Sequence, residues 1–201
     1  MPQLVLASSS PRRRELLDLV NVPYEARKQL VDESKMTCRS PRAYVHALAE
    51  LKGRSVPFSV DNEVILSADT VVSFEGNVLG KPKNREQAFQ MLSMLSGNIH
   101  DVYTGVMIRS SEQETIFVEK TSVEFWPLSK EDINDYLDTG DSYDKAGAYG
   151  IQSHGSILVK QIKGDYYNVV GLPLSRVIRS LRSYGIYPDL SQQEHKVTGN
   201  S

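Results

Sequence analysis

Four short segments of the 201-residue chain combine charged, hydroxyl and glycine residues in ways that could support chemistry. The first is Ser8–Arg14, three serines followed by a proline and three arginines. Serine hydroxyls and free backbone N–H groups at a helix start, next to guanidinium groups, suit the binding of phosphate oxygens. Three arginines at a helix N-terminus also oppose the helix dipole, and a bound anion would offset that cost. The segment therefore favours phosphate binding over a capped helix with a solvated basic turn.

Two further segments supply acids and a base. The polar run Ser67–Thr70 interrupts an otherwise apolar strand, and buried polar groups cost free energy unless they are satisfied. Asp69 in this run could be a general base, a metal ligand or the cap of a neighbouring turn. Lys81 lies between a glycine and a proline, where a lysine is more often a solvated surface charge. The pair Asp32-Glu33 could add oxygen ligands for a hard divalent cation, although alone it is more typical of a surface turn.

The fourth segment, Asp144–Gln152, holds an acid, a base, two glycines and a terminal amide with little bulky apolar content. Packing alone does not account for that composition, so the segment reads either as a loop shaped around a ligand or as an ordinary glycine loop between strands. A second glycine-rich run, Gly164–Pro173, follows it. Acids, bases and glycine loops without a nucleophile dyad together suggest metal-assisted chemistry on a phosphorylated small molecule.

Several function classes are disfavoured by what the sequence lacks. It has neither a P-loop nor a Rossmann glycine pattern, and no Cys or His pair has zinc spacing. The net charge of -2 gives no general attraction to nucleic acid or anionic lipid. A single cysteine, Cys38, excludes an internal disulfide framework. No apolar run resembles a signal peptide or a membrane span, so we expect a cytoplasmic protein without membrane or nucleic-acid partners.

Strand and helix signals alternate along the chain, which predicts an α/β fold with a mixed sheet. Strands are expected at about 3–7, 64–72, 99–110, 114–126 and 157–162, and helices at about 11–20, 41–54, 84–95, 129–138 and 173–184. Serine caps are expected at the first helix, and capping-box spacing marks the starts at Asn84 and Ser129. We expect one domain over residues 1–190 and a polar, disordered tail over 191–201.

The segments that could support chemistry, taken in order, resemble motifs of the Maf family of nucleoside triphosphate pyrophosphatases. The matching motifs are Leu6-Ala7-Ser8, Arg12-Arg13, Ser67 to Val72, Gly80-Lys81-Pro82, His100-x-Val102-x-Thr104-Gly105, Asp144 to Gln152 and Gly164 to Pro173. The resemblance covers roughly residues 4–175. It implies hydrolysis of a nucleoside triphosphate to the monophosphate and pyrophosphate, on an elongated sheet flanked by helices, with two lobes around a deep nucleotide groove.

Within the family, the motifs look like the branch that acts on dTTP and UTP rather than on 7-methyl-GTP. Carried over by motif, Asp69 is the proton acceptor, and Arg12, Thr70 and Gln152 set substrate choice. The Gln152 amide complements the N3–H and O4 edge that uracil and thymine share. Because an amide can flip, the groups that fix Gln152 must complete the discrimination against cytosine.

The resemblance also implies a divalent cation, Mg²⁺ or Mn²⁺, held by Glu33 and Asp69. The phosphate-binding residues would be Ser8, Arg12, Arg13, Lys52 and Lys81. The chain departs from the family pattern in two places: Asp141 stands where a glutamate is usual, and the helix that carries Lys52 matches only loosely. The resemblance is compatible with a homodimer. The alternative function is a nucleotide-sensing regulator of septum formation or cell shape without essential catalysis.

Overall fold

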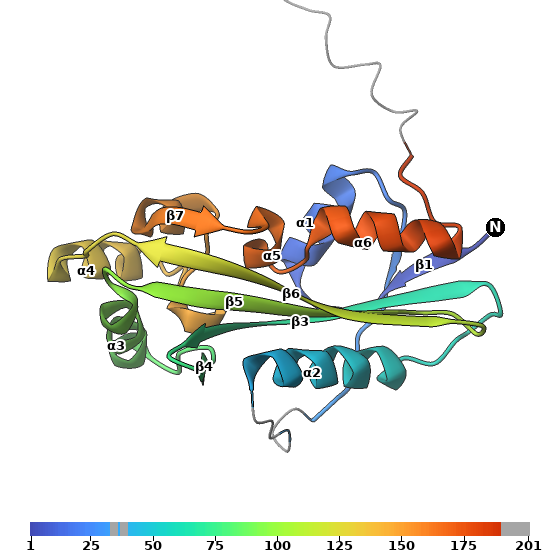
Figure 1. Ribbon diagram of the computed structural model, residues 1–201, viewed down its shortest axis with the longest axis horizontal. Coiled ribbons are helices and arrows are strands. Elements are labelled where there is room, and N and C mark those ends of the chain that lie inside the picture. The colour runs from blue at the N-terminus through green and yellow to red at the C-terminus, as the bar shows by residue number, and fades with distance from the viewer. Residues whose placement is uncertain (33–35, 37–39, 190–201) are drawn as a thin grey trace, which may run out of the picture.

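The computed structural model describes residues 1–32, 36 and 40–189, and its main feature is one long mixed sheet (Figure 1). The strands are β1 Gln3–Leu6, β2 Glu25–Ala26, β3 Glu63–Phe74, β4 Asn77–Leu79, β5 Ile99–Arg109, β6 Glu114–Phe125 and β7 Val159–Lys163. They form a seven-stranded sheet in the order β2-β1-β3-β5-β6-β7, with β4 also paired to β3. β1 pairs in parallel with β2 and β3, whereas the other pairings are antiparallel. The expected mixed α/β architecture is therefore confirmed.

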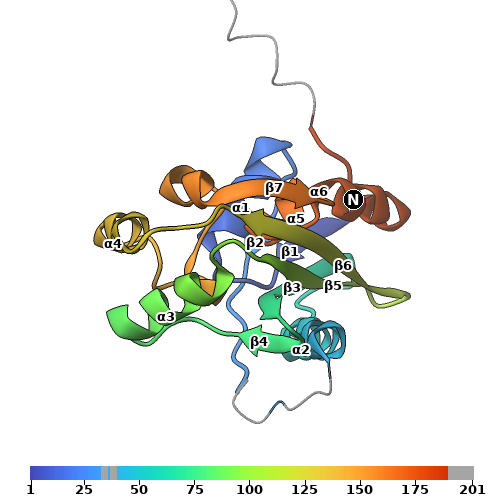
Figure 2. The ribbon, with the colours of Figure 1, turned by 60° about the vertical axis from the view of Figure 1, so that its left-hand side comes forward.

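Helices cover both faces of this sheet. The α-helices are α1 Pro11–Leu19, α2 Pro41–Ser55, α3 Arg85–Leu95, α4 Lys130–Asp138, α5 Tyr166–Val170 and α6 Leu174–Leu181, and short 3-10 helices span Ala146–Ala148, Ser153–Leu158 and Arg182–Tyr184. In both views α2 lies on one side of the sheet, while α1, α5 and α6 lie on the other (Figures 1 and 2). None of the helices in the described ranges has the length and apolar character needed to cross a membrane.

Two apolar clusters lie toward opposite ends of the molecule and share the central strands. One gathers residues of β1, α1 and α6, including Leu6, Leu17 and Leu181. The other gathers residues of α3, α4 and β6, including Leu92 and Phe125. Because each cluster buries its own helices against the same sheet, the molecule has two lobes joined by continuous strands.

The edge of β3 that faces β1 and β4 is interrupted in the middle. β1 pairs with β3 only as far as Leu66, and β4 pairs with it only from Val72 onward. Along its opposite edge, β3 pairs with β5 without a break from Ile65 to Ser73. Side chains on both faces of β3 can therefore approach a ligand at residues 67–71. This interval contains the polar run Ser67–Thr70.

Close packing of α2 against the sheet sets the position of its last turn. A Cβ atom on Gly105 would lie 2.1 Å from the carbonyl oxygen of Val45, so only glycine allows this approach of helix and strand. The Ser67 hydroxyl on β3 also donates to the Ala49 carbonyl oxygen at 2.7 Å. These contacts place Lys52, one turn further along α2, over the middle of β3.

The expected elements largely agree with the structure, and the differences have local causes. The capping box of Ser129 and Asp132 is confirmed. Asn84 caps α3 as expected, but the Gln87 side chain accepts from the backbone N–H of Lys83 and not from that of Asn84. The expected serine cap of α1 is wrong, because the Ser10 side chain makes no capping hydrogen bond.

Further differences concern two element boundaries and three short elements. The strand expected at 157–162 begins only at Val159, because Ser153–Leu158 forms a 3-10 helix. The last helix changes to 3-10 geometry at Arg182 before Gly185 ends it. The short elements β2, β4 and α5 carry too few residues for a periodic signal. The predicted tail at 191–201 and the predicted metal ligand Glu33 lie outside the described residues.

Candidate active site

A cavity of about 610 Å³ opens at the interrupted edge of β3. Its volume is within the range of about 300–1,000 Å³ that is usual for small-ligand pockets. The predicted site residues that line it are Ser8, Arg12, Arg13, Lys52, Asp69, Thr70, Lys81 and Gln152. They come from the start of α1, the end of α2, the middle of β3, the turn after β4 and the 144–152 loop. All predicted site residues that lie in the described part of the chain therefore line one groove.

The inner part of the groove contains a buried ion pair between α2 and β3. The Nζ atom of Lys52 lies 2.6 Å from Oδ1 of Asp69, and their side chains are 7% and 13% exposed. Successive residues of a strand point to opposite faces, so Asp69 shares the α2 face with Ser67, whose hydroxyl also bonds α2. Burying two charges costs several kcal/mol in general, and close pairing is what offsets that cost.

The opposite face of β3 presents Thr70 to a buried arginine. Arg13 donates through Nε to the Gly171 carbonyl oxygen at 2.8 Å, and through Nη1 and Nη2 to the hydroxyls of Ser8 at 3.3 Å and Thr70 at 3.1 Å. The Thr70 hydroxyl also lies 2.9 Å from that of Thr104 on β5. Arg13 thus connects the serine segment, β3 and the turn between α5 and α6.

The three consecutive arginines of α1 have different surroundings, because successive helical residues point about 100° apart. Arg13 is buried in the network just described, and Arg14 is exposed and is not among the residues that line the groove. Arg12 lies at the mouth of the groove, where its Nη1 pairs with Oδ2 of Asp144 at 2.8 Å. The sequence run did not distinguish these roles.

The 144–152 loop forms the wall of the groove that faces α1. Gly147 has a φ of +68°, and a Cβ on it would lie 3.0 Å from atoms of the Val72 side chain, so the loop lies close against β3. The Tyr149 hydroxyl lies 2.7 Å from Nε2 of His100 on β5, and the Gly150 N–H donates to the Tyr136 hydroxyl. These contacts fix the backbone that leads to Gln152.

A chain of alternating charges ties this loop to α1. Lys145 donates to the Asp141 carboxylate at 2.8 Å and to its carbonyl oxygen at 2.7 Å, and it pairs with Oδ1 of Asp144 at 2.7 Å. Burial acts to raise the pKa of Asp144, but hydrogen bonds from Lys145 and Arg12 outweigh burial and lower that pKa. Asp141, the residue that departs from the family pattern, contacts Lys145 in this chain.

The groove also contains residues that sequence reasoning did not select. Tyr44 and Leu48 of α2 line it, together with Gln29 and Val78. The two α2 residues recur at helical spacing, which indicates a core face rather than a site. The structure places this face of α2 in the groove, next to the gap in the edge of β3.

Comparison with known proteins shows the family to which this chain belongs. The family model of the Maf-like proteins matches residues 3–184, and the chain belongs to the Maf family. A dTTP/UTP pyrophosphatase of Geobacillus sp. (strain WCH70) is 50% identical over 185 residues, which cover 92% of this chain and all of the relative. The dTTP/UTP pyrophosphatases of Halalkalibacterium halodurans and Bacillus cereus (strain G9842) are 50% and 46% identical, again over 92% of this chain and over 97% of each relative.

One solved structure, that of the Staphylococcus aureus Ham1 protein, aligns with a TM-score of 0.44 and 13% identity. The alignment covers 61% of this chain and 71% of that one. A likeness this distant carries no argument about the site.

Proposed function

We propose that this protein hydrolyses nucleoside triphosphates to the monophosphate and pyrophosphate, with dTTP and UTP as its substrates. The observation that carries the proposal is the buried carboxylate of Asp69, paired with Lys52 in a groove that cations and a helix start surround. Relatives that are 46–50% identical over nearly their whole length and are named dTTP/UTP pyrophosphatases support it.

Asp69 is the proposed proton acceptor for the attacking water. It forms an ion pair with Lys52, and a carboxylate can accept a proton. The pairing also fixes the orientation of the carboxylate, and a general base must lie within hydrogen-bonding distance of the proton that it removes. Lys52 therefore has two proposed roles, positioning Asp69 and contributing charge toward the phosphates.

The cations around the groove would neutralise the charge that develops on the departing pyrophosphate. Arg12 and Lys81 line the groove as predicted phosphate ligands, and Ser8 contributes its hydroxyl at the start of α1. Arg13 donates to Gly171, Ser8 and Thr70, so its proposed contribution includes holding Ser8 and Thr70 in place. Charge neutralisation and positioning account for most of the catalysis that phosphoryl-transfer sites provide.

A divalent cation, Mg²⁺ or Mn²⁺, is proposed as the cofactor, and the donor chemistry of the groove fits one. Mg²⁺ is usually held by one or two carboxylates together with substrate phosphates and waters, and does not need a cage of protein ligands. Asp69 supplies such a carboxylate, although the described residues contain no cluster of three or more acidic, His or Cys side chains. Glu33 is the second proposed ligand. When bound, the cation would neutralise phosphate charge.

Gln152 and Thr70 are the proposed determinants of base choice, together with Arg12. Gln152 lines the groove at the end of a loop that Gly147, Tyr149 and Gly150 fix in place. A held amide can present its donor and acceptor in one orientation, which suits the N3–H and O4 edge of uracil and thymine. Thr70 is fixed by Arg13 and Thr104 and lines the same groove.

The direct test is a panel of nucleoside triphosphates assayed for pyrophosphate release with Mg²⁺ and with Mn²⁺. We expect dTTP and UTP to be hydrolysed faster than CTP and much faster than GTP and ATP. Equal rates on GTP would refute the base preference. Tight binding of dTTP without pyrophosphate release, with either metal, would favour the nucleotide-sensing alternative. A homodimeric state and a cytoplasmic location remain predictions, and light scattering of the purified protein tests the first.

A further inference from the structure

The acid Asp144 has no role in the proposed chemistry, yet it connects the two walls of the groove. Its Oδ2 accepts from Arg12 at the start of α1, and its Oδ1 pairs with Lys145 on its own loop. The two residues of the Arg12–Asp144 contact are 132 positions apart in the sequence. Asp144 is therefore a carboxylate with a different cation on each oxygen, placed at the mouth of the site.

Lys145 links this contact to the turn that carries Gln152. Its ammonium is held by Asp141 and Asp144, and its side chain is only 12% exposed. Its Cδ and Cε atoms pass so close to Gly150 that a Cβ there would lie 2.7–2.8 Å from them. The Lys145 stem thus packs against the backbone two residues before Gln152.

From these contacts we propose that Asp144 is a positioning residue for base selection, which fixes Arg12 across the groove from the Gln152 turn. The inference rests on the proposed function. Arginine has many rotamers, and its fork of donors is selective only when its plane is held. Because Asp144 holds Nη1 of Arg12, the remaining N–H donors of Arg12 can point in only a few directions. Lys145 binds the same Asp144 carboxylate and so fixes the 144–152 loop relative to it.

The expected effect is modest, because Asp144 is 61% and Arg12 is 27% exposed. Exposed ion pairs contribute at most about 1 kcal/mol, which corresponds to about a fivefold change in an equilibrium constant. For Asp144→Asn we expect the KM for dTTP and UTP to rise about threefold to fivefold. We expect kcat to be nearly unchanged and the preference for UTP over CTP to fall by a similar factor, because the variant retains Asp69 and Lys52.

A double-mutant cycle tests whether Asp144 acts through Arg12. In an Arg12→Gln background, Asp144→Asn should have no further effect on KM or on the UTP/CTP preference. The matched control is Asp138→Asn, which removes an exposed pair with Arg85 that is not among the residues lining the groove. That control should behave like the unmodified protein. A merely structural role for Asp144 would change stability without changing the base preference.

Three results would overturn the proposal: no change of KM in Asp144→Asn, an effect that persists in the Arg12→Gln background, or a lower KM for every triphosphate. The last would mean that Asp144 mainly repels the phosphates. Calorimetric titration with non-hydrolysable α,β-imido-dUTP gives a second readout that does not need turnover. If the unmodified protein releases no pyrophosphate from dTTP, the proposed function fails, whereas the change in the affinity of this analogue still tests Asp144.

Discussion

Two ion pairs of the same chemistry lie at the two ends of the groove and differ mainly in burial. Lys52 and Asp69 are 7% and 13% exposed at its inner part, whereas Arg12 and Asp144 are 27% and 61% exposed at its mouth. Inside the protein a charge is tolerated only with its partner, while water replaces a lost partner at the surface. We therefore expect the inner pair to determine stability and turnover. We expect the outer pair to influence only the preference for one base over another.

Removing the cation of the inner pair should have the largest effect on stability. Lys52→Met leaves Asp69 buried without its ammonium, and breaking a buried pair on one side costs about 3–5 kcal/mol. Urea unfolding at pH 7 measures the change. The double variant Lys52→Met/Asp69→Asn carries neither charge and should recover much of the loss. A loss below about 1 kcal/mol in the single variant would place the pair in the same class as surface pairs.

Neutralising the acid of the inner pair should have the largest effect on catalysis. Asp69→Asn keeps the shape but removes the basicity, and losing a general base costs about 100-fold or more in kcat. The measurement is pyrophosphate release from dTTP at saturating metal, at a temperature where circular dichroism shows the variant to be folded. Asp138→Asn, an exposed acid outside the groove lining, is the control and should retain full activity. Near-normal turnover by Asp69→Asn would remove Asp69 from the proposed role.

His100 shows what burial does to an ionisable group that lacks an opposite charge in close contact. Burial lowers its pKa from 6.5 to about 4, and the attraction of Asp101 only partly opposes this shift. The unfolded chain then binds more protons than the folded one between about pH 4 and 6.5, so stability decreases as the pH falls through that window. We expect a loss of about 2 kcal/mol between pH 8 and pH 5 from this group.

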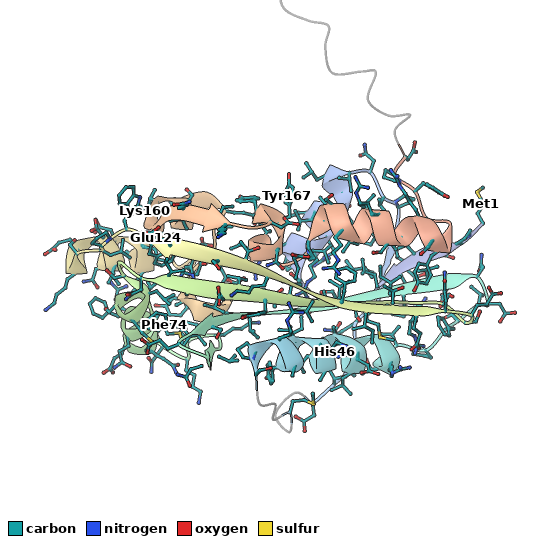
Figure 3. The ribbon with its side chains drawn as sticks, in the orientation of Figure 1. Met1, His46, Phe74, Glu124, Lys160 and Tyr167 are labelled. Atoms are coloured by element: carbon teal, nitrogen blue, oxygen red, sulfur yellow. The ribbon has the colours of Figure 1, made fainter. Side chains whose placement is uncertain are left out.

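Urea unfolding at the two pH values measures that dependence. His100→Gln should reduce it, and the control is the same substitution at His46, which lies exposed on α2 (Figure 3). An unchanged pH dependence in the His100 variant would show that other groups cause the acid sensitivity.

Removing the outer pair should have the smallest effect on stability. Asp144→Asn should change the free energy of unfolding by less than about 1 kcal/mol, because water can solvate Arg12 in its place. The contrast with Lys52→Met is the sharpest test of the role of burial. A loss of several kcal/mol in the free energy of unfolding would contradict this. It would show that the ion pairs linking Arg12 to Asp141 are needed for the stability of the fold.

Much of the fold could be predicted because its longer elements carry regular patterns. The starts of α2, α3 and α4 followed from capping residues, and the hairpin of β5 and β6 followed from two apolar runs with a polar turn. The short elements β2, β4 and α5 could not be predicted, because a few residues show no period. For the same reason the pairing of β4 with β3, which bounds the gap at Asp69, could not be predicted.

The candidate site was predictable as a set of segments but not as a set of contacts. Asp69 and Thr70 are adjacent in the sequence, and strand alternation alone puts them on opposite faces. Which face meets α2, and hence that Asp69 pairs with Lys52 while Thr70 meets Arg13, depends on the packing of the helix at Gly105. The different surroundings of Arg12, Arg13 and Arg14 likewise depend on the docking of α1.

By itself the sequence determined the family, the order of the longer elements and the residue types of the groove, because these follow from local patterns and motifs. Only the tertiary structure decided which charges meet and how deeply they are buried. The decisive contacts join residues 17, 57 and 132 positions apart, for Lys52 with Asp69, Arg13 with Thr70 and Arg12 with Asp144. The strength of each contact depends on how far the folded chain removes it from water, which no local pattern records.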